Sequence, residues 1–325
     1  WMCVVLTSSF VGCSQITPLP EHQVALSQTY PLQTQGNYQV LSWDNYVNDQ
    51  QLINLVDLAL VSNQDLKIAS LRIHEAQAAY GIQRAELFPN IGGNAGMERN
   101  HVPADLSYVG REMTTSQYSV GLGMNQWELD LWGRIRSLNE AALQQFFAVE
   151  SNVQAVRNSL IQQTVLSYLT LSELDKRIYF AQRSVQNYEK SVRLFKRRYE
   201  VGASSKVEYM QAKTMLSNGQ ALVTQLEKSR ALTANYLVQL VGQPTSLHQT
   251  DLDQVTFKTG VLHTGLPSDL LLNRADIRAS EAMLKSKHAN INAARAAFFP
   301  RITLTGSLGT ASADLDGLFK SGSSV

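Results

Sequence analysis

Two kinds of hydrophobic pattern alternate along the chain, and each predicts its own secondary structure. Residues 51–88 are rich in Ala, Leu, Gln and Glu, and Gly81 is the one interior breaker, which predicts a helix that ends before Pro89. Residues 90–99 and 116–126 instead place apolar residues at every second position, which is typical of strands. The expected fold class is therefore mainly α with a smaller β part.

The second alternating segment has two contrasting faces. Its apolar face consists of Tyr118, Val120, Leu122 and Met124, and its small or polar face consists of Ser119, Gly121, Gly123 and Asn125. Such a contrast predicts a membrane strand whose first set faces lipid and whose second set faces a wet lumen. About ten residues suffice to cross a bilayer at a tilt. A soluble hairpin has the same alternation, and it stays open as the alternative at this point.

Long helices follow these strands. Residues 134–200 contain no proline or glycine and would form a helix of about 100 Å. Apolar residues recur along it at alternating steps of three and four, a heptad seam that predicts lengthwise packing against other helices. The members are Ala142, Phe146, Val149, Val153, Val156 and Leu160, and later Ile178, Ala181, Val185, Tyr188, Val192, Phe195 and Tyr199. A return helix is expected from about 204 to 241 and a further helix from about 267 to 298.

One landmark sequence occurs twice in the chain. Residues 84–91 (RAELFPNI) recur as 295–302 (RAAFFPRI), and residues 65–69 recur as 276–280 at the same spacing. In both copies a helical pattern ends at Phe-Pro, and the alternating pattern of a strand follows. This order predicts a tandem structural repeat. We expect a first repeat over 51–262, with a strand pair at about 90–126, a helical hairpin at about 134–241 and a linker after it. The second repeat would begin at 263 and is truncated at 325, so the chain is expected to be a fragment.

The first residues have the pattern of a processed export signal. Residues 1–12 are predicted to be a signal-peptide remnant, and FVGC at 10–13 resembles a lipoprotein box in which Cys13 is acylated. The alternative is a frayed apolar terminus with an idle thiol. Residues 13–50 are rich in Pro, Gln, Tyr and Asn without a sustained period, which predicts an extended N-terminal arm after the lipidated cysteine.

Composition and motifs exclude several classes of function. The chain carries 28 basic and 27 acidic residues, a formal charge of +1, which gives no support for a nucleic-acid surface. It contains no HExxH, CxxC or GxSxG motif, and its histidines are scattered. We therefore expect no enzyme, no catalytic residues, no cofactor and no metal site.

Three segments carry a resemblance to a known family. They are YSVGLG (118–123) followed by WELDLWGR (127–134), then RYEVGASS (198–205) followed by VEYMQA (207–212), and finally NRADIRA (273–279). In order and spacing they resemble the TolC-like outer-membrane efflux proteins, in the lipoprotein branch of the OprM and NodT type. Trp132 and Ala275 depart from the usual Phe and Pro. Asp130 and Arg134, four residues apart at a helix start, are predicted to form a local pair.

The resemblance implies an α/β-barrel channel built by a homotrimer in the outer membrane, extending into the periplasm and surrounded by outer-membrane lipid. It also implies the exit duct of a tripartite, RND-type efflux pump, whose partners are a periplasmic adaptor (membrane fusion protein) and an inner-membrane transporter. Val201, Gly202, Ala203, Ser204 and Ser205 match the family's periplasmic turn, which we interpret as an adaptor-docking turn or as a turn without further role. The alternative function is a periplasmic adaptor or another coiled-coil interaction protein.

Overall fold

A computed structural model of the chain describes residues 17–19, 43–247, 271, 273–320 and 324. The chain divides into two compact units. One consists of Trp1–Gln23, His74–Val149 and Ala279–Val325, and the other of Val24–Ile73 and Glu150–Arg278. The predicted acylation of Cys13 and most of the predicted arm and linker lie outside the described residues.

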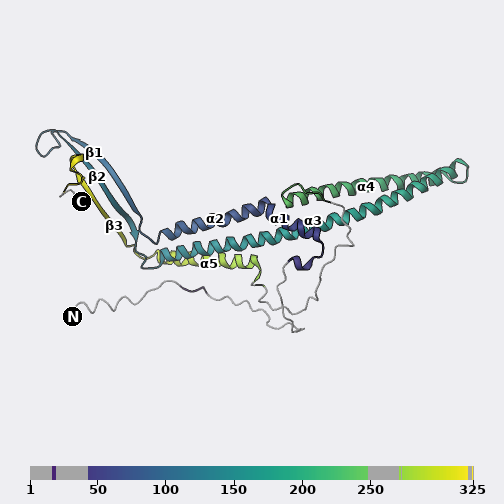
Figure 1. Cartoon of the computed structure of the whole chain (residues 1–325), viewed down its shortest axis with the longest axis horizontal. Helices are drawn as coiled ribbons and strands as arrows, with labels where there is room; N and C mark the ends of the chain where they lie inside the picture. Colours follow the sequence, from purple (N-terminus) through teal and green to yellow (C-terminus); the bar gives the residue numbers. More distant parts are fainter. Residues whose placement is uncertain (1–16, 20–42, 248–270, 272, 321–323, 325) are drawn as a thin grey trace, which may run out of the picture. The chain divides into compact units, whose positions relative to one another are not determined.

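The second unit contains most of a long helical hairpin, whose first residues, up to Val149, belong to the first unit. α3 runs over Arg134–Glu200 and α4 over Lys206–Val241, and the two helices lie antiparallel and side by side up to the tight turn that joins them (Figure 1). The single helix predicted for 134–200 is thus confirmed. Arg230 of α4 forms an ion pair with the buried Asp175 of α3, which fixes one helix against the other.

The core of this unit lies where α1 (Gln50–Ser62) packs against the hairpin. α1 follows a short 3-10 helix, η1 (Trp43–Tyr46), so the arm predicted to be extended is helical near its end. The Asp49 side chain caps α1 and accepts a 2.6 Å hydrogen bond from the Tyr168 hydroxyl. The buried apolar residues come from three helices: Leu52, Leu55, Val56, Ala59, Leu160, Tyr168, Leu171, Leu237, Leu240 and Val241.

The prediction of one helix over 51–88 is wrong. α1 ends at Ser62, and α2 begins at Gln64 and ends at Ala85. Asn63 between them has an extended backbone, its amide nitrogen donates to the Leu240 carbonyl at 2.9 Å, and its amide oxygen accepts from the Leu66 N–H at 2.8 Å. The break thus comes from a side chain that caps the next helix and binds α4, and not from proline or glycine.

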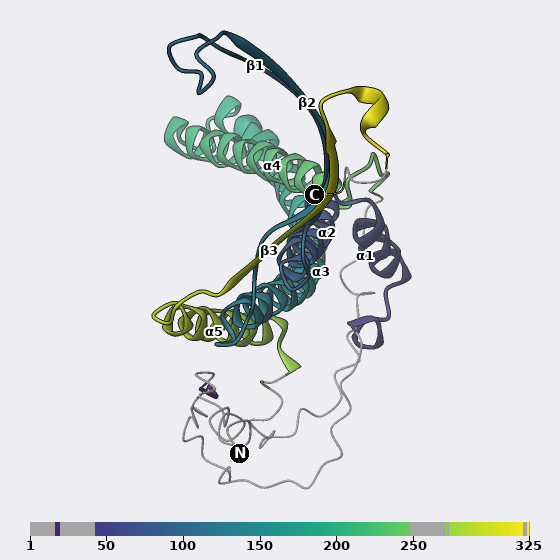
Figure 2. The same cartoon turned by 90° about the vertical axis from the view of Figure 1, so that its left-hand side faces the viewer.

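Strands and the end of the chain belong to the first unit. β1 (Ile91–Val102), β2 (Met113–Glu128) and β3 (Thr303–Ser312) form an antiparallel sheet in that order, with the strands side by side in Figure 2. β3 follows α5 (Ala275–Ala296), which lies within the predicted helix of 267–298. Residues 267–270 and 272 of that prediction lie outside the described residues. After β3 comes a one-turn 3-10 helix, η4 (Leu315–Gly317).

Within the described ranges, none of the helices has the length and apolarity required for a membrane span.

Candidate functional site

The pairing register of the sheet brings the predicted strand faces together. Residues directly opposite each other in antiparallel strands lie on the same face. Tyr118, Val120, Leu122 and Met124 lie opposite Met97, Ala95, Gly93 and Ile91, in that order. Val120 is 38% exposed and Leu122 is 60% exposed, so this apolar face is uncovered in the single chain.

The opposite face carries small and polar residues. Ser119, Gly121 and Gly123 lie opposite Gly96, Asn94 and Gly92, and Asn125 follows Met124, the last residue of β2 that pairs with β1. The same division continues into β3, where Leu308 lies opposite Leu122 and Ser307 lies opposite Gly123. A sheet with one apolar face and one small, polar face can separate a lipid phase from water.

A close approach of β2 and β3 explains two glycines on this second face. Gly121 lies opposite Gly309. A Cβ atom on Gly309 would come within 2.7 Å of the Val120 carbonyl oxygen, and one on Gly121 within 3.2 Å of the Leu308 carbonyl oxygen. Sequence reasoning placed Gly121 in the lumen but missed this packing constraint, because the partner strand is far away in the sequence.

A bulge near the end of β2 was also missed. One extra residue lies between Met124 and Trp127 relative to β3, and Gln126 has a φ of 53°. Trp127 consequently lies opposite Leu304, which is two residues from Gly306 along β3, and so it joins the apolar face. An alternating pattern read from sequence gives no sign of such a one-residue shift.

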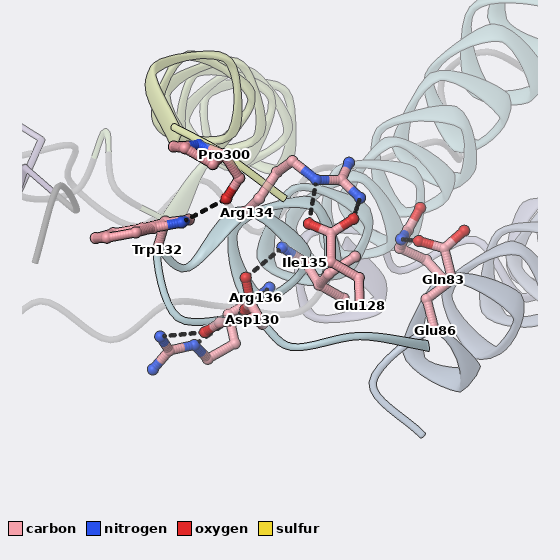
Figure 3. A network of polar contacts seen from close by, with 9 residues as sticks. All are labelled: Gln83, Glu86, Glu128, Asp130, Trp132, Arg134, Ile135, Arg136 and Pro300. Carbon is pink, nitrogen blue, oxygen red and sulfur yellow. Dashed lines mark hydrogen bonds and ion pairs between the residues drawn. The ribbon is translucent and has the colours of Figure 1, made fainter. Parts of the chain in front are cut away.

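Polar contacts fix the junction between β2 and α3 (Figure 3). Glu128 accepts two hydrogen bonds from the Arg134 guanidinium, at 2.8 and 2.6 Å. Asp130 caps α3 by accepting from the Ile135 and Arg136 N–H groups, and it pairs with the Arg136 side chain at 3.1 Å. The expected pair of Asp130 with Arg134 is therefore wrong, because Arg134 forms its ion pair with Glu128. Gly133, the residue before Arg134, has a left-handed φ of 77°. The hydrogen bond to Glu128 raises the pKa of Arg134 against the opposing effect of burial.

Trp132 connects the junction between β2 and α3 to the residues that precede β3. Its ring stacks on Phe299, with centroids 4.8 Å apart. Its indole N–H donates to the Pro300 carbonyl at 3.0 Å (Figure 3). The Leu129 N–H donates to the Ile302 carbonyl at 2.8 Å. The first Phe-Pro landmark leads into β1 and the second into β3, so both landmarks mark the entry to this sheet.

The five predicted turn residues lie together between α3 and α4. The Ala203 N–H donates to the Arg198 carbonyl at 2.7 Å, and Gly202 has a φ of 77°, so the turn ends α3 with a left-handed residue. Ser205 starts α4 with a capping box, in which its side chain accepts from the Glu208 N–H and the Glu208 carboxylate accepts from the Ser205 N–H. Val201 is 65% exposed.

Two further contacts hold the turn, and neither was foreseen. The ring of Tyr199 stacks on that of Tyr209 at 6.1 Å across the hairpin, and the Ser204 hydroxyl donates to the Glu208 carboxylate. A hydrogen bond from Ser204, followed by the bond from the Ser205 N–H, holds the pKa of Glu208 below its usual value. Residues 201–205, here named the knuckle, therefore form a turn that several hydrogen bonds hold in place and that exposes the apolar side chain of Val201.

This pKa shift predicts how the turn responds to acid. Because the pKa of Glu208 is lowered in the folded state, its carboxylate stabilises the turn fully above the ordinary carboxyl pKa of about 4.3. That contribution is lost as the pH falls through the lowered value. Hydrogen exchange of the peptide over 201–209, corrected for intrinsic rates, should accelerate in this acid range. In Glu208→Gln the corrected exchange rate of this peptide should not change with pH in the acid range. If this variant still exchanged faster in acid, the stabilising role of the Glu208 carboxylate would be contradicted.

The chain is similar to known proteins over most of its length. The family described as "Outer membrane efflux protein" matches residues 55–243 and 266–325. The chain is 40% identical over 280 residues to the "Solvent efflux pump outer membrane protein SrpC" of Pseudomonas putida, covering 86% of this chain and 59% of that protein. It is 37% identical over 285 residues to the "Outer membrane protein OprJ" of Pseudomonas aeruginosa, covering 87% of this chain and 60% of that protein.

Solved structures give the same result for the fold. The open state of the MtrE outer membrane channel of Neisseria gonorrhoeae superposes with a TM-score of 0.81 at 34% identity, covering 96% of this chain and 70% of that one. The expected fold class, with long antiparallel helices joined to strands, is confirmed by this likeness. The chain spans about three fifths of the length of the curated relatives named above.

Proposed function

Because the chain belongs to the outer membrane efflux protein family, we propose that the complete protein is the outer-membrane channel of a tripartite efflux pump. In this role it is a passive exit duct for small molecules and performs no chemical step. The resemblance to the TolC-like family drawn from the sequence is confirmed.

The single observation that carries the proposal is the two-faced sheet. Its apolar face presents Leu122 and Leu308, at 60% and 74% exposure, while the face behind it carries glycine, serine and asparagine. Exposing large apolar residues to water is unfavourable, whereas exposing them to lipid is not. This supports lipid-facing roles for Tyr118, Val120, Leu122 and Met124 and lumen-facing roles for Ser119, Gly121, Gly123 and Asn125.

Three strands with open edges do not close a channel by themselves. We infer that three copies of the complete chain assemble, so that strands of neighbouring copies pair. The uncovered apolar residues along α4, such as Val207 and Met215, support the same inference for the helices.

The turn at 201–205 is proposed as the docking site for a periplasmic adaptor, which in turn connects the duct to an inner-membrane transporter. Two structural features support this role. The knuckle lies between α3 and α4, at the end of the long helical hairpin, where a capping box at Ser205 fixes the start of α4. The knuckle also exposes the apolar side chain of Val201. For the N-terminus, we propose that Cys13 carries the lipid anchor, supported by the sequence of residues 10–13.

Cell fractionation of the full-length protein, combined with susceptibility testing of a deletion strain, tests this proposal. We expect the protein in the outer-membrane fraction, and we expect its expression to restore resistance to exported compounds. Recovery with the inner membrane would instead indicate the periplasmic adaptor that the sequence left open as an alternative.

A further inference from the structure

Three polar side chains near the end of α5 hold one residue of the N-terminal arm. The imidazole Nε2 of His288 donates to the Thr17 carbonyl oxygen at 2.8 Å, and the amide nitrogen of Asn292 donates to the same oxygen at 3.2 Å. The Thr17 hydroxyl donates to the amide oxygen of Asn292 at 3.0 Å and accepts from Nη1 of Arg295 at 2.7 Å.

The donors and acceptors of the three α5 side chains match those of Thr17, and this match requires a hydroxyl group at position 17. A hydroxyl group can donate one hydrogen bond and accept others, and that of Thr17 does both. The three α5 residues are spaced four and three positions apart, so they lie on one helix face. Asn292, the central residue, is only 5% exposed, and its amide would lose both partners if the arm left. Releasing Thr17 would exchange these protein hydrogen bonds for hydrogen bonds to water, at a net cost in free energy.

We propose that His288, Asn292 and Arg295 form a binding site, here named the arm clasp, for the N-terminal arm of the same chain. The clasp recognises a peptide carbonyl together with the hydroxyl of a threonine or serine at position 17. This binding role is separate from the proposed efflux function, and it holds whether or not the complete protein transports small molecules.

The clasp restricts where the N-terminus can lie. Cys13 precedes Thr17 by four residues, which span at most about 14 Å when extended. Arg295 is the second-last residue of α5, and Phe298, three residues further on, is 90% exposed just before β3. A lipid anchor on Cys13 would therefore be tethered within this reach of the C-terminal end of α5, the helix that leads into β3.

Protease sensitivity of the arm tests the clasp in the full-length protein purified from membranes. Glu21 is the only glutamate among residues 1–74, so a glutamate-specific endoprotease reports on this part of the arm. Thr17→Val keeps the side-chain outline but removes both hydroxyl contacts. Asn292→Leu removes two of the four hydrogen bonds that α5 makes with Thr17. We expect the rate of cleavage after Glu21 to be about tenfold higher in either variant than in the wild type. The reason is that the protease cuts the arm only while it is released, so the cleavage rate is proportional to the fraction of molecules with a released arm.

Two matched controls separate the clasp from general destabilisation. Thr17→Ser retains the hydroxyl, and Asn290→Leu makes the same change as Asn292→Leu at an exposed position two residues away. Both should be cleaved at the wild-type rate. Wild-type rates in Thr17→Val and Asn292→Leu would overturn the proposal.

A photo-crosslinking residue at position 16 checks whether the clasp and the arm belong to one chain. A product that migrates as a single chain after denaturation supports the proposal. A product with the mass of two chains would overturn it, because the arm would then bind a neighbouring copy.

Discussion

Replacing Gly202 with valine should reduce capture of the periplasmic adaptor by about tenfold while the full-length protein still assembles. Gly202 has a φ of 77°, which a β-branched residue adopts at a cost of about 1–2 kcal/mol. A Cβ atom there would meet no other atom within 4 Å, so the effect comes from the backbone and not from a clash. Crosslinking of the variant to its adaptor, with an efflux assay beside it, provides the measurement.

Gly202→Asn is the matched control for this prediction. Asparagine tolerates the left-handed conformation far better than valine does, so the turn should keep its geometry and capture should stay close to that of the wild type. If Gly202→Val crosslinked normally to the adaptor and supported full efflux, the proposed docking role of the turn would be wrong.

A second large effect is expected in the sheet. Gly309→Val would place a Cβ atom 2.7 Å from the Val120 carbonyl oxygen, a backbone atom that cannot move without separating β2 from β3. We expect destabilisation by about 3 kcal/mol and a marked loss of assembled protein on semi-native gels. Gly306→Val in the same strand is the control, because a Cβ atom there meets nothing within 4 Å. Equal assembly of the two variants would show that the β2–β3 pairing described above is incorrect.

Local patterns predicted the elements whose cause is local. The helix of residues 134–200 follows from the absence of breakers and from its heptad seam. The two faces of β2 follow from strict alternation between 118 and 125. The turn at 201–205 was placed correctly because glycine and serine signal a helix end and a new helix start within a few residues.

Features that depend on distant partners could not be predicted. Asn63 breaks a helix because its side chain binds α4, and Gly309 is required because Val120 lies opposite. Arg134 pairs with Glu128, whereas helical spacing pointed to Asp130, which lies before α3 begins and caps it instead. The clasp at Thr17 joins residues separated by most of the chain, and its three side chains resemble ordinary polar surface residues when read in sequence alone.

Single-channel recording from the full-length protein in planar bilayers, with a cysteine on either face of β2, tests the central claim most directly. Ser119 and Val120 are neighbours that point to opposite faces of the sheet. The account predicts a conductance that a charged, water-soluble thiol reagent reduces in Ser119→Cys and leaves unchanged in Val120→Cys. A protein that conducts no ions, or whose two variants respond alike, would contradict the claim that this sheet separates lipid from a water-filled duct.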